Sequence, residues 1–348
     1  MTPRRSSPSG RPTITDVAAL AGVSPGAVSK TFNGTGSISP ATGERIREAA
    51  RKLNWTPSAS AVALRRARSQ TVGLVLNRQS QSSSLSTTTA DLITGLESVF
   101  AEHEYSLLLH LFTRDQGEEA ALYRRLADSR RVDGVVLTDS TIGDQRYGLM
   151  RDLGMPAVLV GTPWGDDPIP HLPTEGDGGL GAVAEHLLGL GHRRIAYIGG
   201  PEDRVQAGIR RQAFQGALGA AGITAHPVVA TRSYSADESA ELTRTVLDAT
   251  PRPTAIVYGN DIMAIAGMTI AREAGLRVPE DISIVGYDGS SIARWTQPQL
   301  ATVQRNVVQR GRVAAAILLR QLGETVEGSF DLAHPHLVEG RSTGPAPS

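Results

Sequence analysis

Residues 13–34 read TITDVAALAGVSPGAVSKTFNG, a spacing that fits two short helices joined by a tight turn. We expect the Thr15 hydroxyl to cap the first helix and the Ser24 hydroxyl to cap the second. Pro25 follows at the first position of the second helix, where a missing N–H costs nothing. Gly22 stands where the chain must turn. The stretch therefore predicts a helix-turn-helix.

A third helix and the distribution of charge extend this prediction. Ser39 and Pro40 open a helix over residues 41–53 with apolar side chains along one face, so three helices form a small bundle. The spacing alone leaves open a DNA-binding module and an ordinary helical hairpin. Residues 1–70 hold eleven Lys and Arg against three Asp and Glu, a net charge of +8, and the other 278 residues carry −8. A basic head on an acidic body favours binding to phosphates.

From Thr71 onward, apolar strand-like runs alternate with helical patterns. The patterns predict strands at 72–76, 105–112, 132–137, 157–160, 195–198, 227–230, 255–258 and 282–285, and helices at 90–103, 118–129, 207–221, 237–248 and 262–274. Apolar strands separated by helices are typical of parallel sheets covered on both faces. Because the order repeats, we expect an α/β body of two lobes, with a small-molecule site between them.

The sequence also argues against several classes of protein. It has no cysteine, and its eight histidines show no metal-ligand spacing, so we predict no metal. No apolar run approaches the roughly 18–20 residues of a membrane helix, and residues 1–12 lack the apolar segment of a signal peptide. We therefore expect a disordered tail at residues 1–12 and a cytoplasmic protein without membrane contact.

No catalytic pattern emerges either. The G-x-G-x-x-G pattern at residues 176–181 follows a loop rather than a strand, so a flexible helix start is a better interpretation than a nucleotide site. No serine lies in a G-x-S-x-G elbow, and no pair of carboxylates has an acid/base context. We predict no cofactor and no enzymatic activity.

Four ordered motifs mark the head: ITDVAALAGVS at 14–24, VSKTFNG at 28–34, SPAT at 39–42 and LNWTP at 53–57. Together they resemble the DNA-binding head of the lactose-repressor (LacI/GalR) family. The resemblance implies a helix-turn-helix domain over residues 13–57 and a hinge over 58–70 that folds on operator DNA, with Leu64 wedged into the minor groove. The DNA-binding residues it implies are Thr15, Ser24, Pro25, Gly26, Ser29, Lys30, Asn33, Ala61, Leu64 and Arg65.

The second helix, which would enter the major groove, departs from the family pattern. Pro25 and Gly26 stand where base-contacting side chains are usual, and neither has a long polar side chain that could contact a base. Lys30 is therefore the main candidate for direct base contact. Phosphate or positioning contacts suit the polar side chains Ser24, Ser29 and Asn33. The operator sequence of other members cannot be carried over to this chain.

The body, residues 71–343, resembles the effector domain of the same family, which shares the fold of type I periplasmic sugar-binding proteins. The motifs that carry this resemblance are VDGV at 132–135, EHLLGLGHRRIA at 185–196, AIVYGND at 255–261, SIVGYD at 283–288, PQLATV at 298–303 and RST at 341–343. It implies an N-lobe of residues 71–172 and 304–333, a C-lobe of residues 173–303 and 334–343, and a short tail at 344–348.

The resemblance also implies where an effector binds. Arg210, Asn260 and Asp288 match ligand-contacting residues, and Tyr234 occupies a place where an aromatic ring often covers the ligand. Each could instead be a loop or helix-cap residue. Trp164 lies near the expected site, and Arg305 replaces an amide-type residue. We expect a sugar or a related polar metabolite.

These features predict a transcriptional regulator, most simply a repressor, whose effector changes the lobe geometry and thereby the affinity for DNA. Two copies would form a homodimer on a pseudo-palindromic, double-stranded operator, since no leucine heptad follows residue 341 to assemble a tetramer. The alternative is a solute-binding receptor without DNA function, which the body alone would fit. An enzyme on a doubly wound sheet is a third possibility, favoured only by the glycine pattern.

Overall fold

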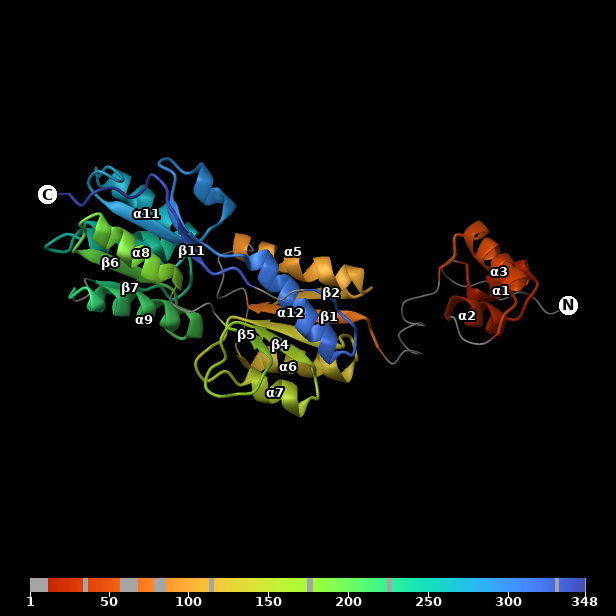
Figure 1. Cartoon of the computed structure of the whole chain (residues 1–348). Helices are drawn as coiled ribbons and strands as arrows, with labels where there is room; N and C mark the ends of the chain where they lie inside the picture. Colours follow the sequence, from red (N-terminus) through yellow and green to blue (C-terminus); the bar gives the residue numbers. More distant parts are fainter. Residues whose placement is uncertain are drawn as a thin grey trace. The chain divides into compact units, whose positions relative to one another are not determined.

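A computed structural model describes residues 12–33, 37–56, 68–77, 86–112, 116–173, 178–223, 227–328 and 332–347. The chain divides into two compact units, Met1–Ser69 and Gln70–Ser348, which we term the head and the body. Figure 1 shows the helical head and the α/β body. Among the described residues, no helix is both long enough and apolar enough to cross a membrane.

Three helices form the head: α1 (Ile14–Ala21), α2 (Pro25–Asn33) and α3 (Pro40–Lys52). Each contributes small or branched side chains to one core, which contains Val17, Ala18, Ala21, Val28, Ile46, Ala49 and Ala50. Between α1 and α2, Gly22 adopts a φ of +65°, and the N–H of Val23 donates to the carbonyl of Ala18 at 3.0 Å. This left-handed end of α1, which costs glycine least, turns the chain back into α2 and confirms the predicted helix-turn-helix.

The prediction that Thr15 caps the first helix is wrong, because Thr13 fills that position. The N–H of Asp16 donates to Thr13 Oγ1 at 3.4 Å, and the N–H of Thr13 donates to Asp16 Oδ2 at 2.8 Å. This reciprocal pair is a capping box, which needs an acidic or amide residue three positions after the cap. Thr15 has Ala18 at that place, so it lies exposed in the first turn of α1 instead.

The N-lobe of the body is built on a parallel sheet in the order β2-β1-β3-β4-β5. Its strands are β1 (Thr71–Asn77), β2 (Ser106–Phe112), β3 (Gly134–Thr138), β4 (Ala157–Val160) and β5 (His171–Leu172). The helices around it are α5 (Thr87–Glu102), α6 (Gln116–Asp128), α7 (Arg146–Asp152) and α12 (Val307–Gln321). Along β1, Leu74 packs with α5 and α12, whereas its neighbour Val75 packs with α6 and α7, so helices cover both faces.

The C-lobe has the strand order β11-β10-β9-β8-β6-β7, parallel except for β11. Its strands are β6 (Ile195–Gly199), β7 (Val228–Ala230), β8 (Ala255–Tyr258), β9 (Ser283–Asp288), β10 (Ala301–Gln304) and β11 (His336–Val338). Helices α8 (Gly178–Gly189) and α9 (Val205–Ala220) cover one face, and α10 (Ala236–Leu247) and α11 (Asp261–Glu273) cover the other (Figure 1). The predicted two-lobed α/β body is confirmed.

The last part of the chain contains elements that the sequence patterns did not predict. After β10 in the C-lobe, the chain enters the N-lobe as α12 and then returns to the C-lobe as β11. Helix α12 packs closely on α5, because Gly95 and Gly311 face each other and a methyl group at Gly95 would clash with the Val308 carbonyl. Most of α12 is buried, and the residues that it exposes are Arg312, Arg320 and Gln321.

Candidate DNA and effector sites

The exposed face of α2 carries residues expected to contact DNA. Val28 is fully buried in the head core and sets the rotation of α2, which leaves Pro25, Gly26 and Lys30 exposed. The Ser24 hydroxyl accepts from the backbone N–H three residues on at 3.2 Å, as predicted for a cap. Lys30 is the one charged residue in the α2 sequence. Its ammonium group is therefore the charged group that α2 can offer to a base or a phosphate of DNA.

The other predicted DNA contacts divide into two groups. Ser29 is half-buried in α2, and Thr15 is exposed at the beginning of α1. Asn33 ends α2, but its side chain lies outside the described residues. The hinge predictions also lie outside them: Ala61, Leu64 and Arg65.

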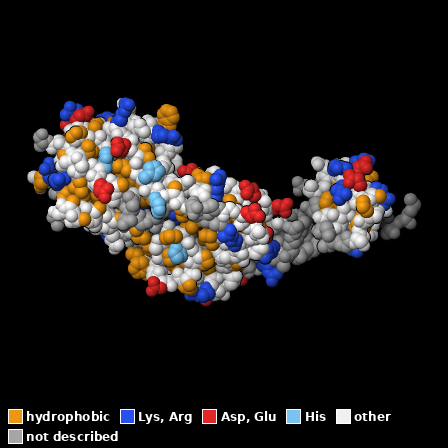
Figure 2. All heavy atoms as spheres, viewed as in Figure 1, with side chains coloured by type: hydrophobic (Ala, Val, Ile, Leu, Met, Phe, Trp, Pro, Cys, Tyr) orange, Lys and Arg blue, Asp and Glu red, His pale blue; other side chains and the backbone are white. Residues whose placement is uncertain are grey.

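The basic side chains of α3 are mostly paired with acidic side chains of the same helix. Glu44 pairs with Arg47 at 3.1 Å and with Arg51 at 3.2 Å, and Glu48 pairs with Lys52 at 2.9 Å. Figure 2 shows such acidic and basic side chains adjacent on the visible face of the head. All of these groups are exposed, where water and salt screen ion pairs so that they contribute little to stability.

Three predicted effector residues, Arg210, Asp288 and Arg305, lie together around Tyr287; we term these four residues the Asp288 cluster. Arg305 Nη1 donates to Asp288 Oδ1 at 3.1 Å, and Arg210 Nη2 lies 3.8 Å from the same oxygen. The Arg210 guanidinium lies 3.9 Å from the centroid of the Tyr287 ring, and the Arg305 guanidinium lies 5.8 Å from it. One carboxylate thus lies within ion-pair distance of two guanidinium groups, beside an aromatic ring.

Parallel strands bring the cluster together. Asp288 ends β9 and is opposite Gln304 at the end of β10, so Arg305 follows at the same edge of the sheet. Asp288 has a φ of +112°, a conformation in which a non-glycine residue is strained. Such strain persists where surrounding contacts hold it, and it is common at ligand sites. The carboxylate is therefore aimed by the end of the strand and by its two arginines.

The guanidinium group of Arg210, on α9, is held in place by a backbone carbonyl. Its Nη1 donates to the carbonyl of Gly259 at 3.0 Å, and the side chain belongs to a residue only 8% exposed. Burial disfavours the guanidinium charge, but the nearby Tyr287 and Asp288 outweigh burial and keep the pKa of Arg210 above its usual value. A permanent positive charge is thus fixed at this place.

The two lobes touch at the Asp288 cluster and at a second place. Thr88 Oγ1, from α5 in the N-lobe, donates to Asp288 Oδ2 at 3.3 Å. At the second contact, the N–H of Val205 donates to the carbonyl of Ser140 at 3.0 Å, and Gln206 Nε2 donates to Asp139 Oδ1 at 3.3 Å. A change at Asp288 can therefore alter a contact between the two lobes.

The remaining predicted effector residues are not linked to the cluster by any hydrogen bond among the described residues. Asn260 Oδ1 caps α11 by accepting from the N–H of Met263 at 2.8 Å, which leaves the amide NH₂ for other partners. The Tyr234 hydroxyl is buried without a hydrogen-bond partner in the described part of the chain, and burial raises its pKa to about 12. Trp164 lies in the loop after β4 and is 49% exposed.

Asp261, which the sequence analysis did not single out, lies behind the cluster and is 2% exposed. Its Oδ2 accepts from the N–H of Ser290 at 2.6 Å and from the Ser290 hydroxyl at 2.7 Å, and its Oδ1 accepts from the Thr302 hydroxyl. Burial, with a smaller contribution from the charge of Asp288, raises the pKa of Asp261 to about 7. Its neighbour Asn260 was predicted, but in the sequence Asp261 is one more acidic residue in the first turn of a helix.

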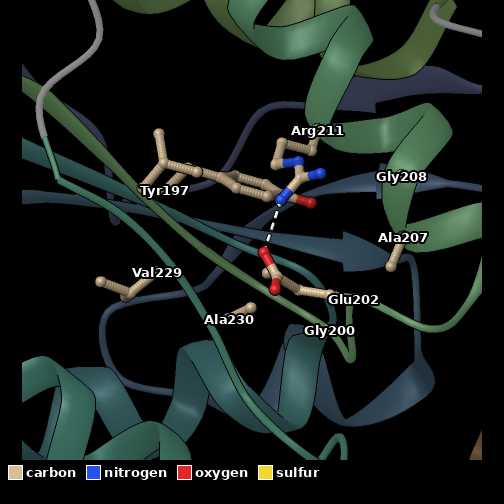
Figure 3. A pocket seen from close by; sticks show the side chains of 10 residues that line it. Tyr197, Gly200, Glu202, Ala207, Gly208, Arg211, Val229 and Ala230 are labelled. Atoms are coloured by element: carbon tan, nitrogen blue, oxygen red, sulfur yellow. Dashed lines mark hydrogen bonds and ion pairs between the residues drawn. The ribbon is translucent and has the colours of Figure 1, made fainter.

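A small hollow elsewhere in the C-lobe lies between β6, β7 and α9. Figure 3 shows that Glu202 and Arg211, which form an ion pair at 2.7 Å, lie beside it with Tyr197. The rest of its lining consists of glycine, alanine and valine residues, and no residue of the N-lobe takes part. A ligand there would contact residues of one lobe only.

Known proteins share this combination of head and body. Residues 13–58 match the model of bacterial regulatory proteins of the lacI family, and residues 184–343 match a periplasmic binding protein-like domain. The HTH-type transcriptional regulator CelR of Thermobifida fusca is 32% identical over 94% of this chain and 97% of its own length. The chain therefore belongs to the LacI family of transcriptional regulators.

Solved structures agree with this assignment. The structure titled transcriptional regulator CelR-cellobiose complex superposes with a TM-score of 0.72 at 32% identity, covering 95% of this chain and 100% of that one. The lac repressor dimer bound to operator and the anti-inducer ONPF superposes with a TM-score of 0.84 at 26% identity, covering 96% and 99%. These relatives are transcriptional regulators rather than enzymes, which agrees with the predicted regulator.

Proposed function

We propose that the protein represses transcription as a homodimer on a pseudo-palindromic operator, and that a sugar or related polar metabolite at the Asp288 cluster controls this binding. The observation that carries the proposal is the set of contacts at Asp288, where Arg210 of the C-lobe, Arg305 of the segment that joins the lobes and Thr88 of the N-lobe meet one carboxylate. Similarity to an operator-bound dimer and to a cellobiose complex supports the two partners. Such a protein acts in the cytoplasm, where operator DNA is.

The chemistry of the cluster suits a hydroxylated ligand. A carboxylate accepts hydrogen bonds from paired hydroxyl groups, while guanidinium groups and the free NH₂ of Asn260 donate to hydroxyl or ring oxygens. A ligand that takes over Asp288 Oδ2 would replace the bond from Thr88 and thus alter the contact between the lobes.

In this proposal, effector binding controls DNA binding through thermodynamic linkage between the two equilibria. If the ligand binds one lobe arrangement more tightly than the other, it shifts the balance between them, typically by about 1–3 kcal/mol in such couplings. The head sequence would read the operator through α2, with Lys30 as the main base contact and Leu64 of the hinge in the minor groove.

The test is a fluorescence anisotropy titration of the full chain on genomic fragments, with and without sugars, over a range of salt concentrations. We expect a sequence-specific complex whose affinity changes at least several-fold with one class of sugar. Lys30→Ala should weaken this complex, whereas the matched control Lys52→Ala, on α3 and paired with Glu48, should change it little. A chain that binds no fragment at low salt would contradict the proposal.

A further inference from the structure

The Asp288 cluster holds more positive than negative charge. Arg210 and Arg305 both approach Asp288 Oδ1, and their guanidinium groups flank the same Tyr287 ring. Two like charges held this close repel each other, and a single carboxylate offsets only one of them. Because these side chains are 9%, 13% and 15% exposed for Arg210, Arg305 and Asp288, water screens the imbalance poorly.

Arg305 is the arginine that remains available to a ligand. Arg210 is committed to the Gly259 carbonyl and to the Tyr287 ring. Arg305 donates from Nη1 to Asp288, and in the described part of the chain no other hydrogen bond of its guanidinium is formed. The planar guanidinium group of an arginine presents five N–H donors and can form bidentate hydrogen bonds with a carboxylate or a phosphate.

Other charged groups nearby do not remove the excess. Asp261 lies behind the cluster, and its oxygens already accept from Ser290 and Thr302. Asp139 lies at the second lobe contact, where Gln206 donates to its carboxylate. Neither carboxylate forms an ion pair with Arg305 among the described residues, so Asp288 is the counter-charge that Arg305 has.

We propose that the effector is an anionic sugar, a hydroxylated frame that carries a carboxylate or a phosphate, and that Arg305 binds this anionic group. The sugar hydroxyls then face Asp288 and the NH₂ of Asn260, while the anionic group supplies the second negative charge to the two arginines. The inference rests on the proposed function and narrows its ligand class. It also gives a physical role to Arg305, which stands where the family resemblance leads one to expect an amide.

The test compares matched neutral and acidic sugars by isothermal titration calorimetry on the full chain. Cellobiose is paired with cellobionate and glucose with glucuronate for the carboxylate arm, and glucose with glucose 6-phosphate for the phosphate arm. We expect at least one acid to bind about tenfold or more tightly than its neutral partner, and the arm that shows this preference identifies the anionic group. Neutral sugars that bind as tightly as every acid, or acids that do not bind, would overturn the inference.

Two substitutions at Arg305 make the test specific. Arg305→Gln removes the charge and should abolish the preference for the acid, whereas Arg305→Lys keeps the charge and should retain part of it. Arg277→Gln, which removes an exposed arginine paired with Asp281, is the matched control and should leave the preference unchanged. An Arg305→Gln chain that melts like the wild type and still prefers the acid would overturn the inference.

Operator binding is measured in the same samples, so that the two proposals can fail separately. Neutral sugars that change operator affinity while acids do not would overturn the anionic class and leave the regulatory role standing. A wild-type chain that binds the acids but no operator would uphold the ligand class and contradict the regulatory role.

Discussion

The head and the Asp288 cluster are two functional regions assembled in opposite ways. The head is one continuous stretch, and its three helices bury a core of seven side chains within about forty residues of sequence. The cluster draws Arg210, Asp288 and Arg305 from α9, from the end of β9 and from the segment after β10, and Thr88 approaches from the other lobe. Local sequence therefore determines the first region, whereas the second exists only when the whole body is folded.

This difference implies that the two regions can be damaged independently. A defect in the head core should abolish DNA binding and spare the effector, and a defect at the cluster should do the reverse. The proposed coupling between them is a difference in affinity rather than a shared core. The predictions that follow test this separation.

The largest effect is expected from Ile46→Ala in the head. Ile46 is fully buried among the helices, and truncating such a side chain typically costs about 2–5 kcal/mol, a large part of the stability of so small a domain. Operator binding should be lost, while effector binding and the main thermal transition of the body remain. Leu20→Ala, at a residue 53% exposed on the same head, is the control and should have little effect. Loss of effector binding in Ile46→Ala would show that the regions are not separable.

Asp288→Asn should have the next largest effect and the opposite pattern. Asparagine tolerates positive φ and retains an acceptor for Thr88, so the chain should fold. The amide loses the charge-assisted hydrogen bonds that the carboxylate accepts from sugar hydroxyls, and we expect effector affinity to fall by about 1.5–3 kcal/mol, roughly ten- to a hundredfold. Calorimetry measures this loss, and anisotropy should show unchanged operator affinity without effector. Asp281→Asn, at the exposed pair with Arg277, should bind effector normally.

Lys30→Ala should weaken operator binding by about 1–3 kcal/mol if its ammonium contacts a base, and it should relax sequence preference at one position. A contact to phosphate alone would weaken all sequences equally and lower the salt dependence by about one ion. Anisotropy on operator variants at several salt concentrations separates these cases. Effector affinity should not change, since Lys30 belongs to the head.

The two regions also differ in how far the sequence could predict them. The helix-turn-helix was predictable, because Gly22, Ser24 and Pro25 act through local backbone geometry. The error at Thr15 was local as well, since the capping box depends on the residue three positions on and Thr13 alone has an acidic one. Such features need no knowledge of the rest of the chain.

For the predicted effector site, the family resemblance supplied Arg210, Asn260 and Asp288, but no pattern could supply their contacts. The Asp288 carboxylate is shared between two arginines only because β9 and β10 end at the same edge. The buried Asp261 was missed because nothing in the sequence distinguishes it from any acidic residue in the first turn of a helix. Burial, which decides its chemistry, is a property of the folded body.

Asp261 provides the smallest expected effect, a pH dependence of body stability. Its pKa is about 7 in the folded chain against an ordinary value of 3.8, so the folded state binds the proton more tightly than the unfolded state. Its contribution to stability is therefore present at pH 4 and is lost as the pH rises to 7. Urea unfolding should show this decline, and Asp261→Asn should remove it. Asp281, whose pKa is lowered to about 2 by hydrogen bonds from Arg277, has the opposite sign: its contribution is lost as the pH falls below 4. The same slope between pH 4 and 7 in the wild type and in Asp261→Asn would show that this carboxyl stays ionised, which places a second negative charge next to the Asp288 cluster.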